Sequence, residues 1–329
     1  MNFSNGQLIQ VIQECKRDDV GEWWKRLLDK VHNITDGRRW IFRALDSPQN
    51  KTDIKEVRAV DDYYVVDTTG KFTDVKIAVK SSFDIAWERR FTDDLTDREF
   101  YEAWMLSEFK RGAHHYQHHL PDDHDFLEWL ALARHYGMPC RLVDFSYSFF
   151  VPCYFAMSGK RKGTHGFILA LDYNWLKAKT EEWLQGCTGN QADMDFHNPN
   201  VFWQFAFVKK PKLVVPVNPS NRNERLINQQ GLFLCPGRIG ESFEANLEKT
   251  LGQVGEAVVR LICAHSALCQ EAIRALRRMN VDMRVLYPDL SGFSQSLRDL
   301  VHEEIGNGVG HHRRYLRKVI DNTSWGSVK

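Results

Sequence analysis

The stretch from Leu130 to Ser148 reads LALARHYGMPCRLVDFSYS and holds the densest structural pattern in the chain. Its first part continues an apolar helical spacing, which Gly137 and Pro139 end as these residue types do at helix C-termini. The run at 140–145 is typical of a strand, and the serines after it are typical of a turn and a helix N-cap. The apolar run at 149–157 predicts a further helix. The segment therefore predicts a helix, a strand and a second helix around one turn.

Outward from this segment, predicted helices and strands alternate without a strict βαβ rhythm. The spacing of apolar residues predicts helices at 8–15, 24–31, 97–109, 126–136, 175–184 and 268–279. Strand-like runs occur at 39–45, 63–67, 75–79, 166–173, 201–208, 213–217, 258–263 and 283–286, with an irregular loop at 186–200. This order favours an α+β fold with flanking helices and a helical N-terminal segment over a doubly wound sheet.

The composition is that of a globular protein and excludes a disordered or fibrous chain. The 329 residues include 44 Lys and Arg against 43 Asp and Glu, so nucleic acid would bind only at a local basic patch. The clearest patch is the run at 311–318, and a weaker one lies at 209–212. Seven cysteines without a C-x-x-C pair indicate reduced thiols, and no apolar stretch of about 18 residues occurs. We therefore expect a cytoplasmic protein that does not span a membrane.

Arg43 is a charged residue inside an otherwise apolar predicted strand, between Phe42 and Ala44. A guanidinium flanked by core residues needs a partner, because an unpaired buried charge is costly. A phosphate is a natural bidentate partner, and an internal ion pair with a carboxylate such as Asp144 is the structural alternative. The spacing leaves both explanations open.

A second group of polar residues surrounds the predicted strand at 140–145 and consists of His135, Arg141, Asp144, Ser146 and Ser148. Backbone N–H groups at a helix start, together with a capping hydroxyl, form a site that binds anions. The spacing alone favours the alternative, an N-cap beside a structural Arg-Asp pair.

A third polar group precedes Gly231 and contains Glu224, Arg225, Gln229 and Gln230. Apolar residues flank this group on both sides, which predicts a strand edge with its polar side chains turned toward a cleft. A solvated strand end is the alternative. Only the meeting of all three polar groups in space would separate these interpretations.

Two His pairs, His114 with His118 and His115 with His119, have the i, i+4 spacing of zinc ligands on a helix. No third ligand and no intervening Glu accompany them, so we expect a solvated helix end and no metal. The chain also has no P-loop, no G-x-G-x-x-G and no G-x-S-x-G motif. Nucleotide hydrolysis at a P-loop and acyl transfer at a nucleophile elbow therefore have no support.

Several blocks of the chain resemble the FRG domain family, whose pattern runs W-x-F-R-G, L-A-Q-H-x-G-x-P-T-R-L-L-D-W-T-x-S-P and A-L-Y-F-A. The matching blocks are WIFRA at 40–44, the segment at 130–148, PCYFA at 152–156, RLINQQGLF at 225–233 and YPDLSG at 287–292. The resemblance therefore spans residues 38–300. Ala44 replaces the family glycine, and Arg134, Cys140, Phe145 and Phe149 replace the usual Gln, Thr, Trp and Pro. The positions that match include Arg43, His135, Arg141, Asp144, Ser148, Arg225 and Gln230.

The three-part layout is similar to that of ADP-ribosyltransferases, which bind NAD in a cleft of a split β-sheet. The resemblance implies a mixed, largely antiparallel split sheet of this kind. In this scheme Arg43 binds the NAD phosphates. Ser146 and Ser148 order the nicotinamide ribose, and Asp144 holds Arg43 or Arg141.

The same resemblance adds His135, Tyr154 and Arg225 to the residues expected to contact NAD, which acts as substrate. A side chain of the third polar group would stabilise the oxocarbenium-like transition state or orient the acceptor. Gln230 stands where the transferase pattern usually has Glu, and Glu224 is the nearest carboxylate. The third group is therefore the part of the site that departs most from the pattern.

The resemblance implies an NAD-dependent ADP-ribosyltransferase that modifies a macromolecular acceptor, RNA or protein. Proteins with this domain resemble members of bacterial toxin-antitoxin and phage-defence loci, which implies a toxin-like effector with an antitoxin or chaperone partner. Two alternatives stay open: a non-catalytic module that binds a nucleotide or nucleic acid, and an NAD glycohydrolase. We expect an N-terminal helical segment at 1–37, an FRG domain at 38–300 and a basic tail at 301–329.

Overall fold

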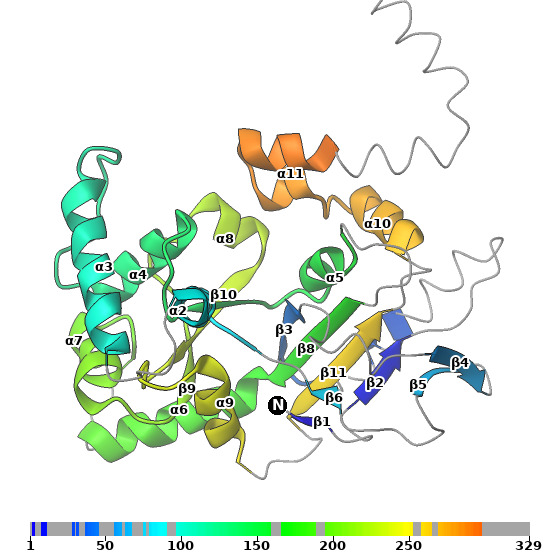
Figure 1. The fold of residues 1–329 in the computed structure, drawn as a ribbon, viewed down its shortest axis with the longest axis horizontal. Coiled ribbons are helices and arrows are strands. Elements are labelled where there is room, and N and C mark those ends of the chain that lie inside the picture. The colour runs from blue at the N-terminus through cyan, green and yellow to red at the C-terminus, as the bar shows by residue number, and fades with distance from the viewer. Residues whose placement is uncertain are drawn as a thin grey trace, which may run out of the picture.

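The computed structural model describes residues 2–3, 8–11, 28–29, 31–32, 37–45, 56–60, 63–67, 75–76, 79–90, 97–158, 166–188, 195–252, 258–264 and 269–297. The strands are β1 (Asn2–Phe3), β2 (Leu8–Val11), β3 (Trp40–Leu45), β4 (Glu56–Val60), β5 (Tyr63–Asp67), β6 (Val75–Lys76), β7 (Val143–Ser146), β8 (Gly166–Asp172), β9 (Val214–Val217), β10 (Gly231–Pro236) and β11 (Val259–Ala264). The helices are α2 (Ser82–Arg90), α3 (Arg98–Ala113), α4 (Phe126–His135), α5 (Phe150–Met157), α6 (Tyr173–Thr188), α7 (Pro199–Trp203), α8 (Glu224–Asn228), α9 (Phe243–Leu251), α10 (Cys269–Arg278) and α11 (Met283–Leu286), with a π-helix, η1 (Gln204–Lys209). Figure 1 shows these elements in space.

A seven-stranded sheet with the order β2-β11-β8-β3-β7-β10-β9 is the centre of the fold. All of its neighbouring strands are antiparallel except the parallel pair β2 and β11. Strand β3 pairs with β8 from Trp40 to Leu45, but it pairs with β7 only where Phe42 lies opposite Ser146. The α+β class and the largely antiparallel sheet are therefore confirmed, and backbone pairing within the sheet is weakest between β3 and β7.

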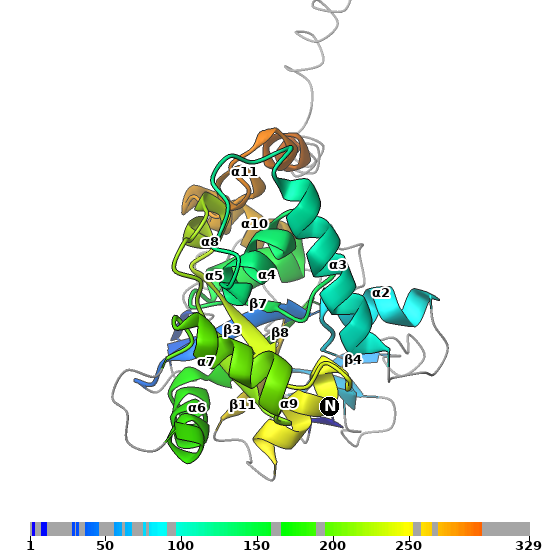
Figure 2. The same cartoon turned by 90° about the vertical axis from the view of Figure 1, so that its left-hand side faces the viewer.

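Helices cover this weakly paired region. Helix α5 contacts β3, β7 and β8, and α10 packs against α5. Helices α3 and α4 lie against each other (Figure 2), and α4 also contacts α7. Every residue of β8 is buried, so the sheet is covered on both faces there.

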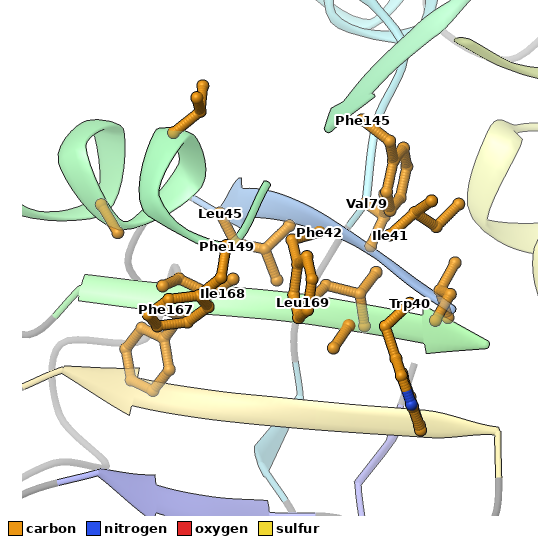
Figure 3. Close-up of a cluster of buried hydrophobic side chains, with 14 of the residues drawn as sticks. Trp40, Ile41, Phe42, Leu45, Val79, Phe145, Phe149, Phe167, Ile168 and Leu169 are labelled. Atoms are coloured by element: carbon orange, nitrogen blue, oxygen red, sulfur yellow. The ribbon is translucent and has the colours of Figure 1, made fainter. Parts of the chain in front are cut away.

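Two large apolar clusters make up most of the described core, and at β10 they are divided because successive strand residues point to opposite faces of the sheet. In β10, Leu232 and Leu234 belong to the first cluster, whereas Phe233 and Cys235 belong to the second. Figure 3 shows part of the first cluster, where side chains of β3 and β8 meet Phe149 at the start of α5. The rings of Phe42 and Phe149 meet edge to face with centroids 5.6 Å apart. Both faces of the sheet therefore contribute to the core.

Most of the predicted elements in the described residues are confirmed with small shifts in their ends, but the predictions for 8–11, 201–208 and 283–286 were wrong, as was the strand edge before Gly231. Residues 8–11 form strand β2, not a helix, because their backbone pairs with β11. Residues 201–208 form α7 and η1 instead of a strand, because the Asn198 side chain caps the helix start and Pro199 favours it. Residues 283–286 form α11, because the Asp282 carboxylate accepts hydrogen bonds from the N–H groups of Arg284 and Val285.

Gly166 begins β8 where the strand passes closely over α5. A Cβ at this position would lie 2.3 Å from the carbonyl oxygen of Ala156, a backbone atom that cannot rotate away. We expect Gly166→Ala to lower the free energy of unfolding by about 1–3 kcal/mol, measured by urea denaturation. Gly186→Ala in α6 is the matched control, because nothing lies within 4 Å of its added Cβ and alanine favours a helix. Equal stability of the two variants would contradict the close approach.

Candidate functional site

A cavity of about 200 Å³ lies beside the single backbone pair that joins β3 and β7. Its walls come from β3, α4, β7, α5, α8 with the residue that follows it, and the residue that follows α11. The polar lining consists of Arg43, Arg134, Asp144, Ser146, Arg225, Gln229 and Tyr287. The apolar lining consists of Phe42, Ala44, Phe145, Val151, Pro152 and Phe155. The fold therefore gathers residues from all three polar groups of the sequence in one place.

Arg43 and Asp144 lie across the junction of β3 and β7. The Nη1 atom of Arg43 donates a hydrogen bond of 2.6 Å to the backbone carbonyl oxygen of Asp144. This contact joins the two strands beside the pair of Phe42 and Ser146. Arg43 is half-buried and lines the cavity, so the strand holds a guanidinium at the cavity wall.

The carboxylate of Asp144 pairs with Arg134 from the last turn of α4. The Nε atom of Arg134 lies 3.0 Å from Oδ2 of Asp144, and its Nη2 atom donates to the same oxygen. Burial raises the pKa of Asp144, but the charges of Arg134, Arg43 and Arg225 and the hydrogen bond from Arg134 outweigh it and hold this pKa below its usual value. Asp144 is therefore ionised at neutral pH, and the cavity is lined by three guanidinium groups and one carboxylate.

Arg225 enters the cavity from α8 and stacks on Tyr287. Its guanidinium carbon lies 4.2 Å from the centroid of the Tyr287 ring, and its Nη2 atom donates to the phenol oxygen at 2.9 Å. Within the part of the chain that the structure describes, no carboxylate forms an ion pair with Arg225. Asn228 and Gln229 donate to the carbonyl oxygens of Val285 and Leu286, which fixes α11 against α8. These bonds hold Tyr287 at the cavity wall.

The serines after β7 have mainly structural hydrogen bonds. The hydroxyl of Ser146 donates to the carbonyl oxygen of Gln229 at 2.7 Å and accepts from the N–H of Ser148. The Oγ atom of Ser148 accepts from the N–H of Phe150, the first residue of α5. Ser146 lines the cavity and Ser148 does not. The predicted serine N-cap was wrong, because the N-cap residue of α5 is Phe149, which makes no side-chain capping bond.

Arg141, expected to contact NAD or pair with Asp144, lies elsewhere. Its side chain is 2% exposed and forms an ion pair with Glu102 of α3, with Nε 2.8 Å from Oε2. Its Nη1 atom donates to the carbonyl oxygen of Ala206. Burial of the guanidinium requires this carboxylate partner, which lies 39 residues away in the sequence and was not found from spacing. The expectation for Arg141 is therefore corrected to a structural pair.

Three further candidates lie outside the cavity wall. Gln230 is exposed with a φ of 45°, and its neighbour Gln229 lines the cavity instead. Glu224 is exposed at the N-terminus of α8, where its charge favours the helix dipole. Tyr154 is 1% exposed within the core of α5. The segment before Gly231 forms helix α8 instead of the expected strand edge. This difference explains why Gln230 and Glu224 lie outside the cavity wall.

The sequence analysis missed Arg134, Tyr287 and Phe155 as lining residues, whereas Gln229 belonged to the third polar group. Arg134 was noted only as a departure from the family pattern, although a charge within the apolar run LALAR was a usable signal. Tyr287 begins the YPDLSG block that supported the resemblance. Phe155 lies in the PCYFA block, but the side of α5 that carries its side chain depends on the residue at which the helix begins.

The described residues give little support for a metal site or a nucleic-acid site. No group of three His, Cys, Asp or Glu side chains among them could hold a metal ion. Lys210 pairs with Glu99 and Lys212 pairs with Glu241, so two charges of the weaker basic patch are neutralised locally. The basic run at 311–318 lies outside the described residues. No described helix has both the length and the apolar character needed to cross a membrane.

These features define an α+β protein with an arginine-lined cavity at a weakly paired position of its sheet. The family model described as FRG domain matches residues 79–165, which confirms the resemblance to the FRG domain family over this segment. The matched segment contains Arg134 and Asp144, whereas Arg43, Arg225 and Tyr287 lie outside it. No curated protein and no solved structure matches the chain.

His135 follows Arg134 and has a buried Nδ1 atom without a hydrogen-bond partner in the described structure. Burial and the charge of Arg225 lower its pKa from 6.5, against an opposing effect of Asp289. The unfolded chain therefore binds this proton at higher pH than the folded chain, so the free energy of unfolding falls as the pH drops below 6.5. Between about pH 7.5 and 5.5, the range around the usual histidine pKa, we expect the free energy of unfolding of His135→Gln to fall less than that of the wild type.

The matched control for this prediction is His118→Gln, because His118 is exposed. Its loss of stability over the same pH range should equal that of the wild type, measured by urea denaturation at each pH. The same pH dependence in the wild type and in His135→Gln would contradict the prediction.

Proposed function

We propose that this protein binds NAD at the arginine-lined cavity and transfers its ADP-ribosyl group to a macromolecular acceptor. The observation that carries the proposal is the lining of the cavity by Arg43, Arg134 and Arg225 with Asp144 as the one lining carboxylate. Among the lining residues, guanidinium groups outnumber carboxylates, and this composition suits the negative charge of a diphosphate. Arginine is well adapted to this role because its planar donors bind phosphate oxygens in a bidentate manner.

In the proposed reaction the bond between nicotinamide and the ribose C1′ atom breaks, and nicotinamide leaves with the bonding electron pair. A nucleophile of the acceptor forms the new bond to C1′ and loses its proton. Asp144 is held ionised beside Arg134, so it supplies a negative charge that favours the developing oxocarbenium character of the sugar. The apolar side chains of Phe42, Val151 and Phe155 exclude water from part of the cavity wall.

Binding without turnover is a second candidate function, and a specific observation favours it. Asp144 is the one carboxylate among the lining residues, and its Oδ2 atom already pairs with Arg134. Glu224, the other carboxylate considered for catalysis, is exposed outside the cavity wall. A nucleotide-binding module needs the arginines and no second carboxylate.

The test measures NAD binding by calorimetry and nicotinamide release with and without RNA or protein acceptors. Release that requires an acceptor, with label from NAD on that acceptor, supports the transferase. Release without an acceptor indicates a glycohydrolase, and binding without release indicates the binding module. Arg43→Ala should abolish the signal, whereas the matched control Arg111→Ala, an exposed arginine of α3, should retain it. No NAD binding by the wild type would overturn the proposal.

A further inference from the structure

Helix α3 carries exposed aromatic side chains on the side that faces away from the core. The helix lies at the left-hand edge of the molecule in Figure 1. Phe100 and Trp104, about one turn apart, are 66% and 51% exposed. The opposite side of the helix is buried and carries Arg98, Glu102, Leu106 and Ala113. Exposed apolar surface of this kind is typical of a site that binds another protein.

The residues around these two aromatic side chains have the spacing of a helix that packs against one other helix. They follow each other at alternating intervals of three and four residues, and all of them are exposed. They are Asp97, Phe100, Trp104, Ser107, Arg111 and His114. Alternating intervals of three and four are the a and d positions of a heptad repeat, which face one neighbouring helix. These six residues, the exposed stripe of α3, therefore lie on one line along the helix.

The exposed stripe is complementary to itself in an antiparallel pair. A two-fold axis midway between residues 105 and 106 places each residue opposite the one at the same distance from the axis in a second copy. Trp104 then lies opposite Ser107 of the second copy, and Ser107 lies opposite the second Trp104. A large side chain packs well over a small one, because the two fill the space between the helices without overlap.

The outer layers of this arrangement are complementary in charge. Phe100 lies opposite Arg111, and a guanidinium over an aromatic face gives a cation–π attraction. Asp97 lies opposite His114, and its carboxylate makes no capping hydrogen bond in its own helix. A parallel pair would instead place Asp97 against Asp97 and Arg111 against Arg111. The charges therefore favour a second copy that runs antiparallel.

The length of α3 limits the strength of this association. Its 16 residues span about 24 Å, and a helix with its side chains is about 10 Å wide. Two faces of this size bury less than the roughly 1,200 Å² of total surface that a stable complex buries. The dimer is therefore weak and depends on protein concentration.

We propose that the exposed stripe of α3 binds a second copy of this chain, so that two α3 helices pack antiparallel in a weak symmetric dimer. No residue of α3 lines the cavity. Dimerisation and ligand binding are therefore separate properties of the protein.

Analytical ultracentrifugation of the full chain measures the association. The wild type should pass from monomer to dimer between about 1 µM and 1 mM, the range of a weak complex. Trp104→Glu should raise the dissociation constant at least about tenfold, because it removes the aromatic anchor and adds a charge to each central layer. The substituted side chain is exposed, so the core is not disturbed.

The matched control is Leu290→Glu, which adds the same charge at an exposed apolar residue outside α3. It should change the dissociation constant by less than about threefold. A wild type that stays monomeric at about 1 mM would overturn the proposal. An equal effect of Trp104→Glu and Leu290→Glu would also overturn it.

A mixture of two further variants tests the antiparallel arrangement. Trp104→Lys and Ser107→Glu should each weaken self-association at least about tenfold, because like charges then lie close to the two-fold axis. In the mixed dimer the two new charges have opposite signs and lie opposite each other, and the second central layer keeps Trp104 over Ser107. The mixture should therefore associate at least about threefold more tightly than either variant alone. No gain on mixing would overturn the proposal.

Discussion

Replacing Arg141 with Met is expected to lower the free energy of unfolding by about 3–5 kcal/mol. Arg141 and Glu102 are 2% and 1% exposed, so the substitution leaves a carboxylate buried without its cation. The carbonyl oxygen of Ala206 also loses its donor. Urea denaturation of the wild type and the variant measures the difference. This is the largest change in stability that we expect from a single side chain.

Two comparisons separate the buried charge from other effects of Arg141→Met. The double variant Arg141→Met with Glu102→Gln should recover part of the loss, because Gln carries no charge and its oxygen can still accept from the N–H of residue 141. The matched control is Arg111→Met, whose pair with Glu108 is exposed and contributes less than about 1 kcal/mol. Similar losses in Arg111→Met and Arg141→Met would show that the pair is not buried in solution.

Replacing Arg225 with Ala is expected to weaken the proposed binding of NAD about 10- to 150-fold, which corresponds to the loss of one charged hydrogen-bonding group. Arg225 carries a charge that no described carboxylate neutralises, and alanine is well tolerated in a helix such as α8. The dissociation constant from calorimetry measures this effect. Arg225→Lys should recover part of the affinity, because it keeps the charge but loses the planar donors.

Arg222 provides the control for Arg225, because it is exposed, lies three residues earlier and does not line the cavity. Arg222→Ala should change the affinity by less than about threefold, as a screened surface charge does. If both alanine variants weakened the affinity equally, general surface charge would account for the binding. The cavity would then not be the binding site.

Local patterns in the sequence predicted most of the elements around the site. The helix that ends at Gly137, the strand with Asp144 and the helix after Ser148 follow from periodicity, capping and stop residues, which depend on neighbours a few positions away. The strand predictions for 201–208 and 283–286 were wrong because aromatic and β-branched runs also occur in capped helices. In these cases a single cap residue decided between helix and strand.

By itself, the sequence determined the resemblance to the FRG domain family, which the family model confirms over residues 79–165, the α+β class of the fold, and the position of Arg43 and Asp144 as charged residues on otherwise apolar strands. Those properties depend on local spacing. Only the tertiary structure decided which charges meet. The partner of Arg141 lies 39 residues away and that of Arg225 lies 62 residues away, and the spacing along a chain carries no information on contacts at such separations. The fold sets both contacts, because it brings Glu102 of α3 to Arg141 and places α4, α8 and α11 around the junction of β3 and β7.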